Sequence, residues 1–187
     1  DPSGWADVNE AREKLYEAPL FLDCSTHAMT TITIRSACRR LDGQLKRQGS
    51  KLGLIVVDYL QLMQGNVKRH ENREAEVAEI SRSIKSIAMD LKVPVLALSQ
   101  LNRRGEETGR APVLSDLRES GAIEQDSNIV IFLHPETKAA APDRQAIDEL
   151  LNRCVIKLII AKHRNGARGE IAMHFKKDIT SFTEARE

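Results

Sequence analysis

The sequence predicts an α/β domain in which helices flank a mainly parallel sheet and an antiparallel hairpin extends the sheet at its C-terminal end. Aromatic residues make up only 4% of the 187 residues, so the core is built mainly from aliphatic side chains, as is usual for layered helices and strands. Short apolar runs alternate with amphipathic stretches, the pattern of parallel strands joined by crossover helices. The pair Asn165-Gly166 separates the last two long apolar runs and predicts a hairpin, since both residues tolerate positive φ.

Composition excludes several other classes. The apolar runs are far too short to cross a bilayer and the first residues lack signal-peptide character, so we expect a soluble, cytoplasmic protein without membrane contact. Cys24, Cys38 and Cys154 are odd in number and widely spaced, which predicts buried, reduced thiols. A net charge of +1 favours no partner class, because a nucleic-acid surface would have to come from local clustering. The chain lacks an initiator Met, and we expect it to be a piece of a longer protein.

The N-terminal third predicts two helices and a strand. We expect a helix over 5–17, capped by Ser3 and ended by Pro19, and a strand over 19–23. Thr30 or Thr31 caps a second helix that runs to about 48 and turns its basic residues outward. Its apolar stripe consists of Ile34, Ala37, Cys38, Leu41 and Leu45.

The middle of the chain predicts two buried strands around a long helix. The run 52–58 is continuous and apolar, which indicates a strand covered on both faces. A polar loop over 64–72 precedes an amphipathic helix, and 93–100 forms the next strand, followed by a polar loop over 102–112. The inward stripe of the helix consists of Val77, Ile80, Ile84, Ile87, Ala88 and Leu91.

The last third predicts a short helix, a strand, an excursion and the hairpin. Ser115 caps a short helix over the string SDLRESGAIEQD, and 128–133 forms a strand that continues the sheet. The stretch 134–153 is polar and interrupted by proline, so we interpret it as a surface insertion. The strings VIKLIIA and EIAMHF form the two arms of the final hairpin.

Two polar residues end neighbouring predicted strands. Asp58 follows four apolar residues, the Walker B pattern, in which one carboxylate at a strand mouth holds a divalent cation against phosphates. Gln100 closes the next strand and could bind a γ-phosphate or position a water. Strand ends also carry Asp for capping and amides that are satisfied locally, so these features alone leave the function open.

Two further groups could bind anions. Arg118 and Glu119 precede Gly121, and a cation beside an exposed backbone suits a nucleic-acid phosphate, although an ordinary surface helix has the same composition. Lys162 and Arg164 are two apart, so they share one face of a strand end and could reach one anion, or else form a solvated hairpin tip. His163 points to the other face, and we assign it no catalytic role.

The combination of motifs is far more specific than its parts. The strings LIVVDYLQLM, EISRSIKSIA, VPVLALSQL, SDLRESGAIEQD and IIAKHRNG occur in this order and spacing. Together they closely resemble the C-terminal motor domain of the replicative DNA helicases of the DnaB family, over about 5–182. The resemblance implies a RecA-like fold, use of ATP and Mg²⁺, and a homo-hexameric ring that moves on single-stranded DNA and unwinds duplex at the replication fork.

The resemblance also implies roles for the nucleotide-binding residues. Asp58 matches the Walker B aspartate that helps hold Mg²⁺, and Gln100 matches the catalytic residue that senses the γ-phosphate and links it to the DNA loops. Lys162 and Arg164 match the catalytic basic pair that reaches the nucleotide of the neighbouring subunit as an arginine finger.

The implied DNA-binding residues are Arg118, Glu119 and Gly121, which match the loop that tracks the single-strand backbone. The family further implies primase and a helicase loader as partners, and the bacterial nucleoid or replisome as the place of action.

The sequence departs from the family pattern in two places. No Gly-Lys dipeptide occurs, so the chain lacks a G-x-x-x-x-G-K-[ST] phosphate loop, and we expect 1–187 to be the C-terminal portion of an incomplete motor domain that does not hydrolyse nucleotide alone. The insertion at about 134–153 is also unlike the family. Two alternatives stay open: another RecA-like ATPase of recombinase or clock type, and a non-catalytic binding module.

Overall fold

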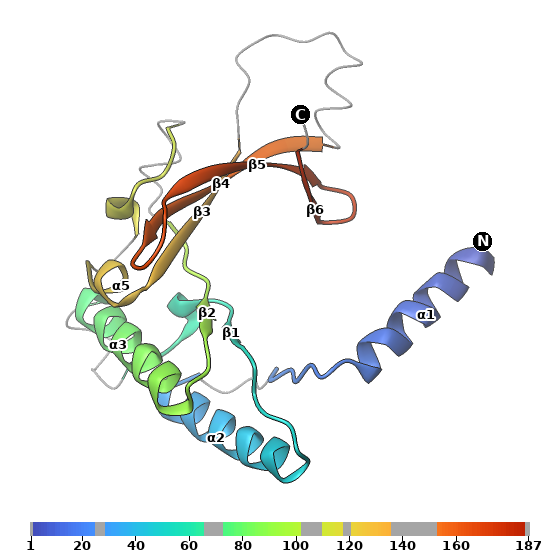
Figure 1. Ribbon diagram of the computed structural model, residues 1–187, viewed down its shortest axis with the longest axis horizontal. Coiled ribbons are helices and arrows are strands. Elements are labelled where there is room, and N and C mark those ends of the chain that lie inside the picture. The colour runs from blue at the N-terminus through green and yellow to red at the C-terminus, as the bar shows by residue number, and fades with distance from the viewer. Residues whose placement is uncertain are drawn as a thin grey trace, which may run out of the picture.

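The computed structural model describes residues 2–24, 29–65, 73–101, 110–117, 121–135 and 153–185. Within these ranges the mixed helix and strand class is confirmed (Figure 1). The strands form two sheets, a two-stranded parallel sheet and a four-stranded antiparallel one. The helices α2 and α3 lie side by side next to the parallel sheet, while α1 stands apart from the rest of the molecule (Figure 1).

Helix α1 (Pro2–Glu17) confirms the first predicted helix. It begins earlier than expected, so Ser3 lies within the helix and not at its N-cap position, and proline suits the first helical position. Its apolar residues Trp5, Val8 and Leu15 are exposed. The predicted strand over 19–23 is wrong: this segment has no strand structure, because no described strand lies beside it to take up its backbone hydrogen bonds.

Helix α2 (Thr31–Arg47) confirms the second predicted helix and selects Thr30 as its N-cap. The Thr30 hydroxyl accepts the Thr33 N–H at 3.2 Å, and the Thr33 hydroxyl accepts the Thr30 N–H at 3.0 Å, which is a reciprocal capping box. Near the other end, Asp42 is buried and pairs with Lys46 at 2.6 Å. The hydrogen bond from Lys46 holds the pKa of the Asp42 carboxyl below its ordinary value.

The main core lies between α3 (Arg73–Leu91) and the parallel strands β1 (Ile55–Val57) and β2 (Val95–Ala97). In the predicted stripe of α3, Val77, Ile80, Ile84 and Ile87 are buried. The strands pair in register, Ile55 opposite Val95 and Val57 opposite Ala97.

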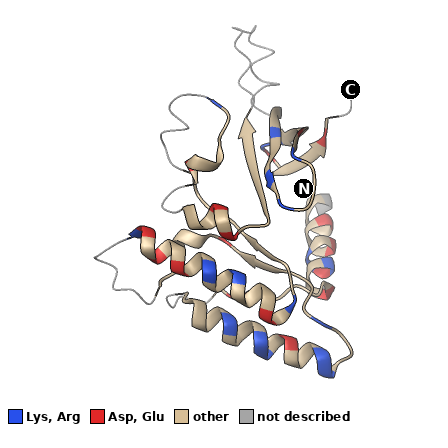
Figure 2. Ribbon diagram, turned by 60° about the vertical axis from the view of Figure 1, so that its left-hand side comes forward, with Lys and Arg blue, Asp and Glu red and all other residues tan. Residues whose placement is uncertain are grey.

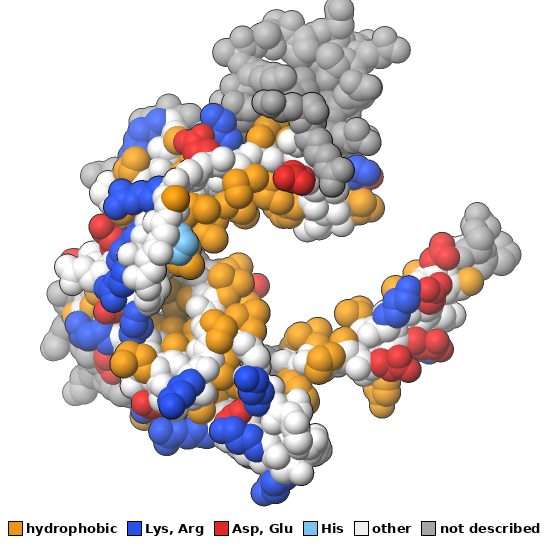
Figure 3. All heavy atoms as spheres, in the orientation of Figure 1, with side chains coloured by type: hydrophobic (Ala, Val, Ile, Leu, Met, Phe, Trp, Pro, Cys, Tyr) orange, Lys and Arg blue, Asp and Glu red, His pale blue; other side chains and the backbone are white. Residues whose placement is uncertain are grey.

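Only one face of this parallel pair is covered, which corrects the expectation of strands covered on both faces. Ile55 and Val57 are buried, whereas Leu54, Val56 and Leu96 are more than half exposed. Figure 3 shows hydrophobic side chains gathered on the hollow side of the molecule, between the strands and α1. Charged residues lie mainly on the helices (Figure 2). Within the described residues, the second face of these two strands therefore stays uncovered.

The antiparallel sheet has the order β3-β4-β5-β6. Strand β3 (Ile129–Pro135) was expected to continue the parallel sheet, but it pairs antiparallel with β4 (Arg153–His163). Strands β4 and β5 (Gly169–Lys176) form the predicted hairpin around Asn165-Gly166. The sequence missed β6 (Ser181–Glu184), which pairs with β5 and brings the rings of Phe175 and Phe182 to 4.5 Å.

The remaining expectations have mixed outcomes. All three cysteines are free, as predicted. Cys24 is exposed and the other two are only partly buried, so the prediction that all three are buried is wrong. Partial burial raises the pKa of the Cys38 thiol.

No helix in the described ranges is long and apolar enough to cross a membrane. The predicted insertion falls almost entirely on 136–152, outside the described residues.

Candidate functional site

The carboxyl ends of β1 and β2 lie next to each other and carry two of the predicted site residues. The backbone pairing continues past the strands, because Leu98 N–H donates to Val57 C=O and Leu60 N–H donates to Leu98 C=O, both at 2.9 Å. Asp58 follows β1 directly and is exposed. Gln100 follows β2 by three residues and is also exposed. The structure therefore brings Asp58 and Gln100 to one edge of the parallel sheet, as the sequence predicts.

Gln61 links these two strand ends, and sequence reasoning gave it no role. It lies in the short 3₁₀ helix η1 (Leu60–Leu62). Its side-chain N–H₂ donates to the Ser99 hydroxyl at 3.0 Å and to the Gln100 carbonyl at 3.2 Å. Its side-chain oxygen accepts the Gln100 N–H at 3.3 Å. The sequence signal was its position inside the string DYLQLM, three residues after Asp58.

A buried polar group on α3 holds the segment that carries Gln61. The Gln61 carbonyl accepts from Arg73 at 3.0 Å, and Arg73 pairs with Glu76 at 2.5 Å. Glu76 is only 3% exposed, and its carboxylate also accepts the Gly65 N–H at 2.9 Å. A Cβ on Gly65 would lie 2.7 Å from Cγ of Glu76, so this approach requires glycine.

Lys162 and Arg164 lie in the other sheet, at the end of β4 and just beyond it. The Lys162 ammonium donates to the carbonyl of Glu124 in α5 (Gly121–Asp126). Arg164 is exposed, and its backbone N–H donates to Asn128 C=O at 2.9 Å. Among the described residues no carboxylate pairs with its guanidinium. His163 lies 3.3 Å from the Ala167 carbonyl through Nδ1, within its own hairpin.

The predicted DNA-binding segment is described only in part. Arg118 and Glu119 lie outside the described residues, while Gly121 is the first residue of α5. Ser115 lies within the 3₁₀ helix η2 (Leu114–Asp116) and does not cap α5, which corrects that expectation. The two helical pieces are separate because the Leu117 backbone leaves η2 in an extended conformation.

An ion pair fixes the residues just before this segment, and the sequence analysis missed it. Arg110 donates two hydrogen bonds to the Asp116 carboxylate, at 2.8 and 2.7 Å, and the Val113 N–H donates a third at 2.8 Å. The Arg110 guanidinium holds the pKa of Asp116 below its ordinary value. Leu117 in turn forms a β-bridge with Leu101, next to Gln100. The bridge and the ion pair connect the end of β2 to the residue before Arg118.

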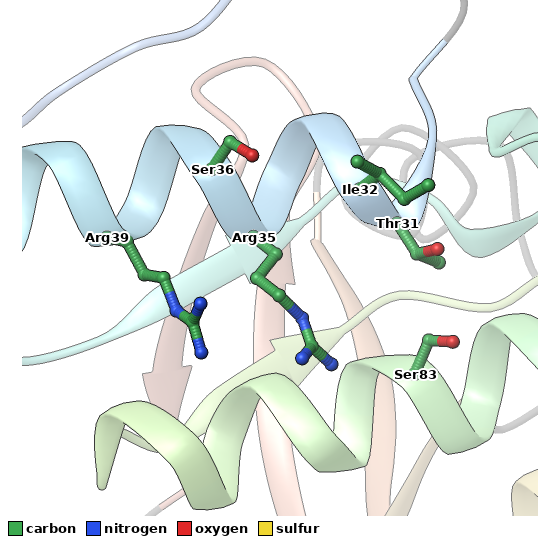
Figure 4. Close-up of a pocket in the computed structure, with 6 residues that line it drawn as sticks. All are labelled: Thr31, Ile32, Arg35, Ser36, Arg39 and Ser83. Atoms are coloured by element: carbon green, nitrogen blue, oxygen red, sulfur yellow. The ribbon is translucent and has the colours of Figure 1, made fainter.

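An open pocket of about 290 Å³ lies between helices α2 and α3. Arg35 and Arg39 extend from α2 toward α3 (Figure 4). Both pair with Asp90, at 3.0 and 3.5 Å, and Arg35 also donates to the Ser86 hydroxyl at 2.9 Å. These contacts join the two helices.

The chemistry available at the parallel edge is that of a single carboxylate and an amide. No group of three or more His, Cys, Asp or Glu that could hold a metal occurs among the described residues. One exposed carboxylate nevertheless fits Mg²⁺, which proteins often bind through one or two carboxylates together with substrate phosphates.

Fold and site together define the class of protein, an α/β domain with a parallel and an antiparallel sheet and with polar residues at its parallel strand ends. Among solved structures, the chain is similar to a DnaB-like replicative helicase whose structure addresses its interactions with primase, with a TM-score of 0.80 and 31% identity over 97% of this chain and 42% of that one. It is also similar to a second solved structure, described as an ATPase domain, with a TM-score of 0.78 and 32% identity over 97% of this chain and 60% of that one.

Sequence comparisons give the particular family. The model of the DnaB-like helicase C-terminal domain matches residues 1–184. The replicative DNA helicase DnaB of Geobacillus stearothermophilus is 43% identical over 97% of this chain, and the replicative DNA helicase DnaC of Bacillus subtilis is 42% identical over 95%. The chain belongs to the DnaB-like helicase C-terminal domain family. It spans 37% of the length of each of these two relatives.

Proposed function

We propose that this chain is the C-terminal portion of the motor domain of an ATP-dependent replicative DNA helicase. The observation that carries the proposal is the match to the family over residues 1–184, together with the placement of Asp58 and Gln100 at one sheet edge. The helicase would act as a homo-hexameric ring on single-stranded DNA at the replication fork, in the bacterial nucleoid.

The parallel edge supplies the part of the nucleotide site that comes from within one subunit. Asp58 would hold Mg²⁺, which neutralises charge on the β- and γ-phosphates of ATP. Gln100 would contact the γ-phosphate through its side-chain amide. Within the described part of the chain this amide has no hydrogen-bond partner, and the residue is exposed, so it is available to a ligand.

The end of β4 supplies the part that reaches a neighbouring subunit. Arg164 is exposed, and its planar guanidinium suits phosphate oxygens whose charge spreads in the transition state. Lys162 already donates to the Glu124 carbonyl, but an ammonium has three N–H donors. It can therefore keep this bond and still meet a phosphate of the neighbouring nucleotide.

The segment before α5 is the proposed contact to single-stranded DNA. Arg118 would pair with backbone phosphates, Glu119 would orient the loop, and Gly121 would let the backbone approach the strand at the start of α5. We propose primase as a protein partner, because the structure of one relative addresses its interactions with primase. A helicase loader is a second proposed partner, on the resemblance to the family alone.

The test is nucleotide hydrolysis and strand displacement by the full-length protein. We expect hydrolysis that single-stranded DNA stimulates, and ATP-dependent unwinding of a forked duplex. Asp58→Asn should abolish both, whereas Asp7→Asn on the exposed face of α1 should change neither. Hydrolysis without unwinding would instead favour a RecA-like ATPase of recombinase or clock type. Absence of any nucleotide dependence would favour a binding module.

A further inference from the structure

Past the ends of β1 and β2, the side chain of Gln61 makes the hydrogen bonds that a neighbouring strand would make. The last backbone hydrogen bond between the two segments joins Leu60 N–H to Leu98 C=O. One residue further on, the amide of Gln61 donates to Gln100 C=O and accepts from Gln100 N–H, at 3.2 and 3.3 Å. Both polar groups of the Gln100 backbone are thereby satisfied by one side chain, in the way that a neighbouring strand would satisfy them.

The base of this contact is rigid. Leu60, the first residue of the 3₁₀ helix, and Met63, the residue after it, are 4% and 1% exposed. The Gln61 carbonyl is held by Arg73, which pairs with the buried Glu76. A side chain whose own backbone is fixed in this way transmits its position to the group that it binds.

The contact fixes the Gln100 backbone, whereas the Gln100 side chain is exposed. Its backbone N–H and C=O are both bonded to Gln61, while its side chain is exposed. We infer that Gln61 is a positioning residue: it sets the place of the Gln100 side chain relative to the end of β1, and hence to a γ-phosphate held beside Asp58. This inference rests on the proposed function.

The chemistry of the contact requires an amide at position 61. Its nitrogen donates to Ser99 and Gln100 and its oxygen accepts from Gln100, and only Asn and Gln carry both groups in one planar unit. A glutamate of the same shape keeps an acceptor for the Gln100 N–H. It loses the donor, however, and places a carboxylate oxygen against the Gln100 carbonyl.

The test compares Gln61→Glu with Gln64→Glu in the full-length protein. Gln64 lies three residues further along the same connection and is half-buried like Gln61. Its backbone N–H donates to Met29 C=O, and its side chain has no hydrogen bond within the described residues. We expect Gln61→Glu to lower kcat for ATP by about tenfold or more while KM changes by less than about twofold, because a small displacement of a group near the reacting atoms affects the transition state most. Gln64→Glu should leave both constants unchanged.

A second variant covers the case in which Gln61→Glu does not fold. Ser99→Ala removes one of the three hydrogen bonds to the Gln61 side chain, and we expect a smaller fall in kcat, again with KM little changed. A kcat within about twofold of wild type for the folded Gln61→Glu protein would overturn the inference. An equal fall in Gln64→Glu would overturn it as well. If the wild-type protein itself neither hydrolyses ATP nor responds to DNA, the proposed function fails whatever Gln61 does.

Discussion

The ends of β1 and β2 and the end of β4 present their polar groups in different ways. At the parallel edge, backbone pairing and the Gln61 amide fix the chain on both sides of Asp58. At the end of β4, the Arg164 backbone is held by Asn128, but among the described residues its guanidinium meets no carboxylate. The two regions also belong to different sheets. This difference fits our proposal that the first region would hold a ligand within one subunit, and that the second would offer a cation to an anion of a neighbouring subunit.

The largest effect should come from testing the 187-residue chain alone in place of the full-length protein. The 187-residue chain has no G-x-x-x-x-G-K-[ST] motif, so no lysine and glycine-rich backbone cradle the phosphates, and one face of β1 and β2 is uncovered. We expect no ATP hydrolysis by this chain at a subunit concentration at which the full-length protein is active. Phosphate release by the chain alone, at the rate of the full-length protein, would show that the parallel edge is a complete site.

The next largest effect should come from Arg164→Ala in the full-length protein. An arginine that stabilises transferring phosphate from a neighbouring subunit contributes about 10³-fold or more to hydrolysis, so kcat should fall by that order. Binding of a fluorescent ATP analogue should stay within about twofold, because Asp58 and Gln100 remain. Arg168→Ala is the matched control, since Arg168 is an exposed arginine of the same hairpin. Normal turnover in Arg164→Ala would mean that the end of β4 takes no part in catalysis.

A smaller effect is expected from a change at Arg118, in the proposed DNA-binding segment before α5. Arg118→Ala should weaken binding to oligo-dT and reduce the slope of log affinity against log salt concentration by about 1, because one phosphate contact is lost. Arg40→Ala, on the exposed face of α2, should not change the slope. An unchanged slope in Arg118→Ala would show that this segment touches no phosphate.

The smallest effect concerns the ion pair before that segment. Arg110 lowers the pKa of Asp116 from its ordinary value of 3.8, so the pair stabilises the fold above pH 3.8, and this contribution is lost as the pH falls through the lower value of the folded state. Asp116→Asn should therefore unfold at a lower urea concentration than wild type at pH 7. The difference between the urea midpoints of the two proteins should become smaller below about pH 4. A difference in urea midpoint that stays constant down to acid pH would show that the ionised pair does not stabilise the segment.

Local patterns predicted the helices and the hairpin well. Thr30 is the N-cap of α2, the apolar stripe of α3 forms the core, and Asn165-Gly166 joins β4 to β5. Each of these depends on neighbours within a few residues, such as a capping box, a helical period or a turn between two strands. The hairpin is confirmed, but the positive φ expected at its turn is wrong, since neither Asn165 nor Gly166 has one. A short stretch of sequence is therefore enough to predict each of these elements.

Pairing between segments that are distant in the sequence was harder to predict. Residues 19–23 have the composition of a strand but no described partner, and β3 pairs with β4 instead of extending the parallel sheet. The same difference between local and distant contacts holds for the site residues. Asp58 and Gln100 were found because strands end at them, whereas the contact between Gln61 and Gln100 joins residues 39 apart in sequence. The place of Gln61 in the string DYLQLM does not identify its partner, because an amide at a turn is equally compatible with solvent.

Subunit mixing is the measurement that tests the division between the two regions most directly. Asp58→Asn and Arg164→Ala proteins, each inactive alone, would be combined in equal amounts, allowed to exchange subunits and assayed for ATP hydrolysis. If one subunit supplies Asp58 and its neighbour supplies Arg164, about a quarter of the interfaces in mixed head-to-tail rings carry both intact residues, and hydrolysis returns in proportion. A mixture that has exchanged subunits but stays as inactive as its components would show that both residues act within the same subunit, and would contradict the account.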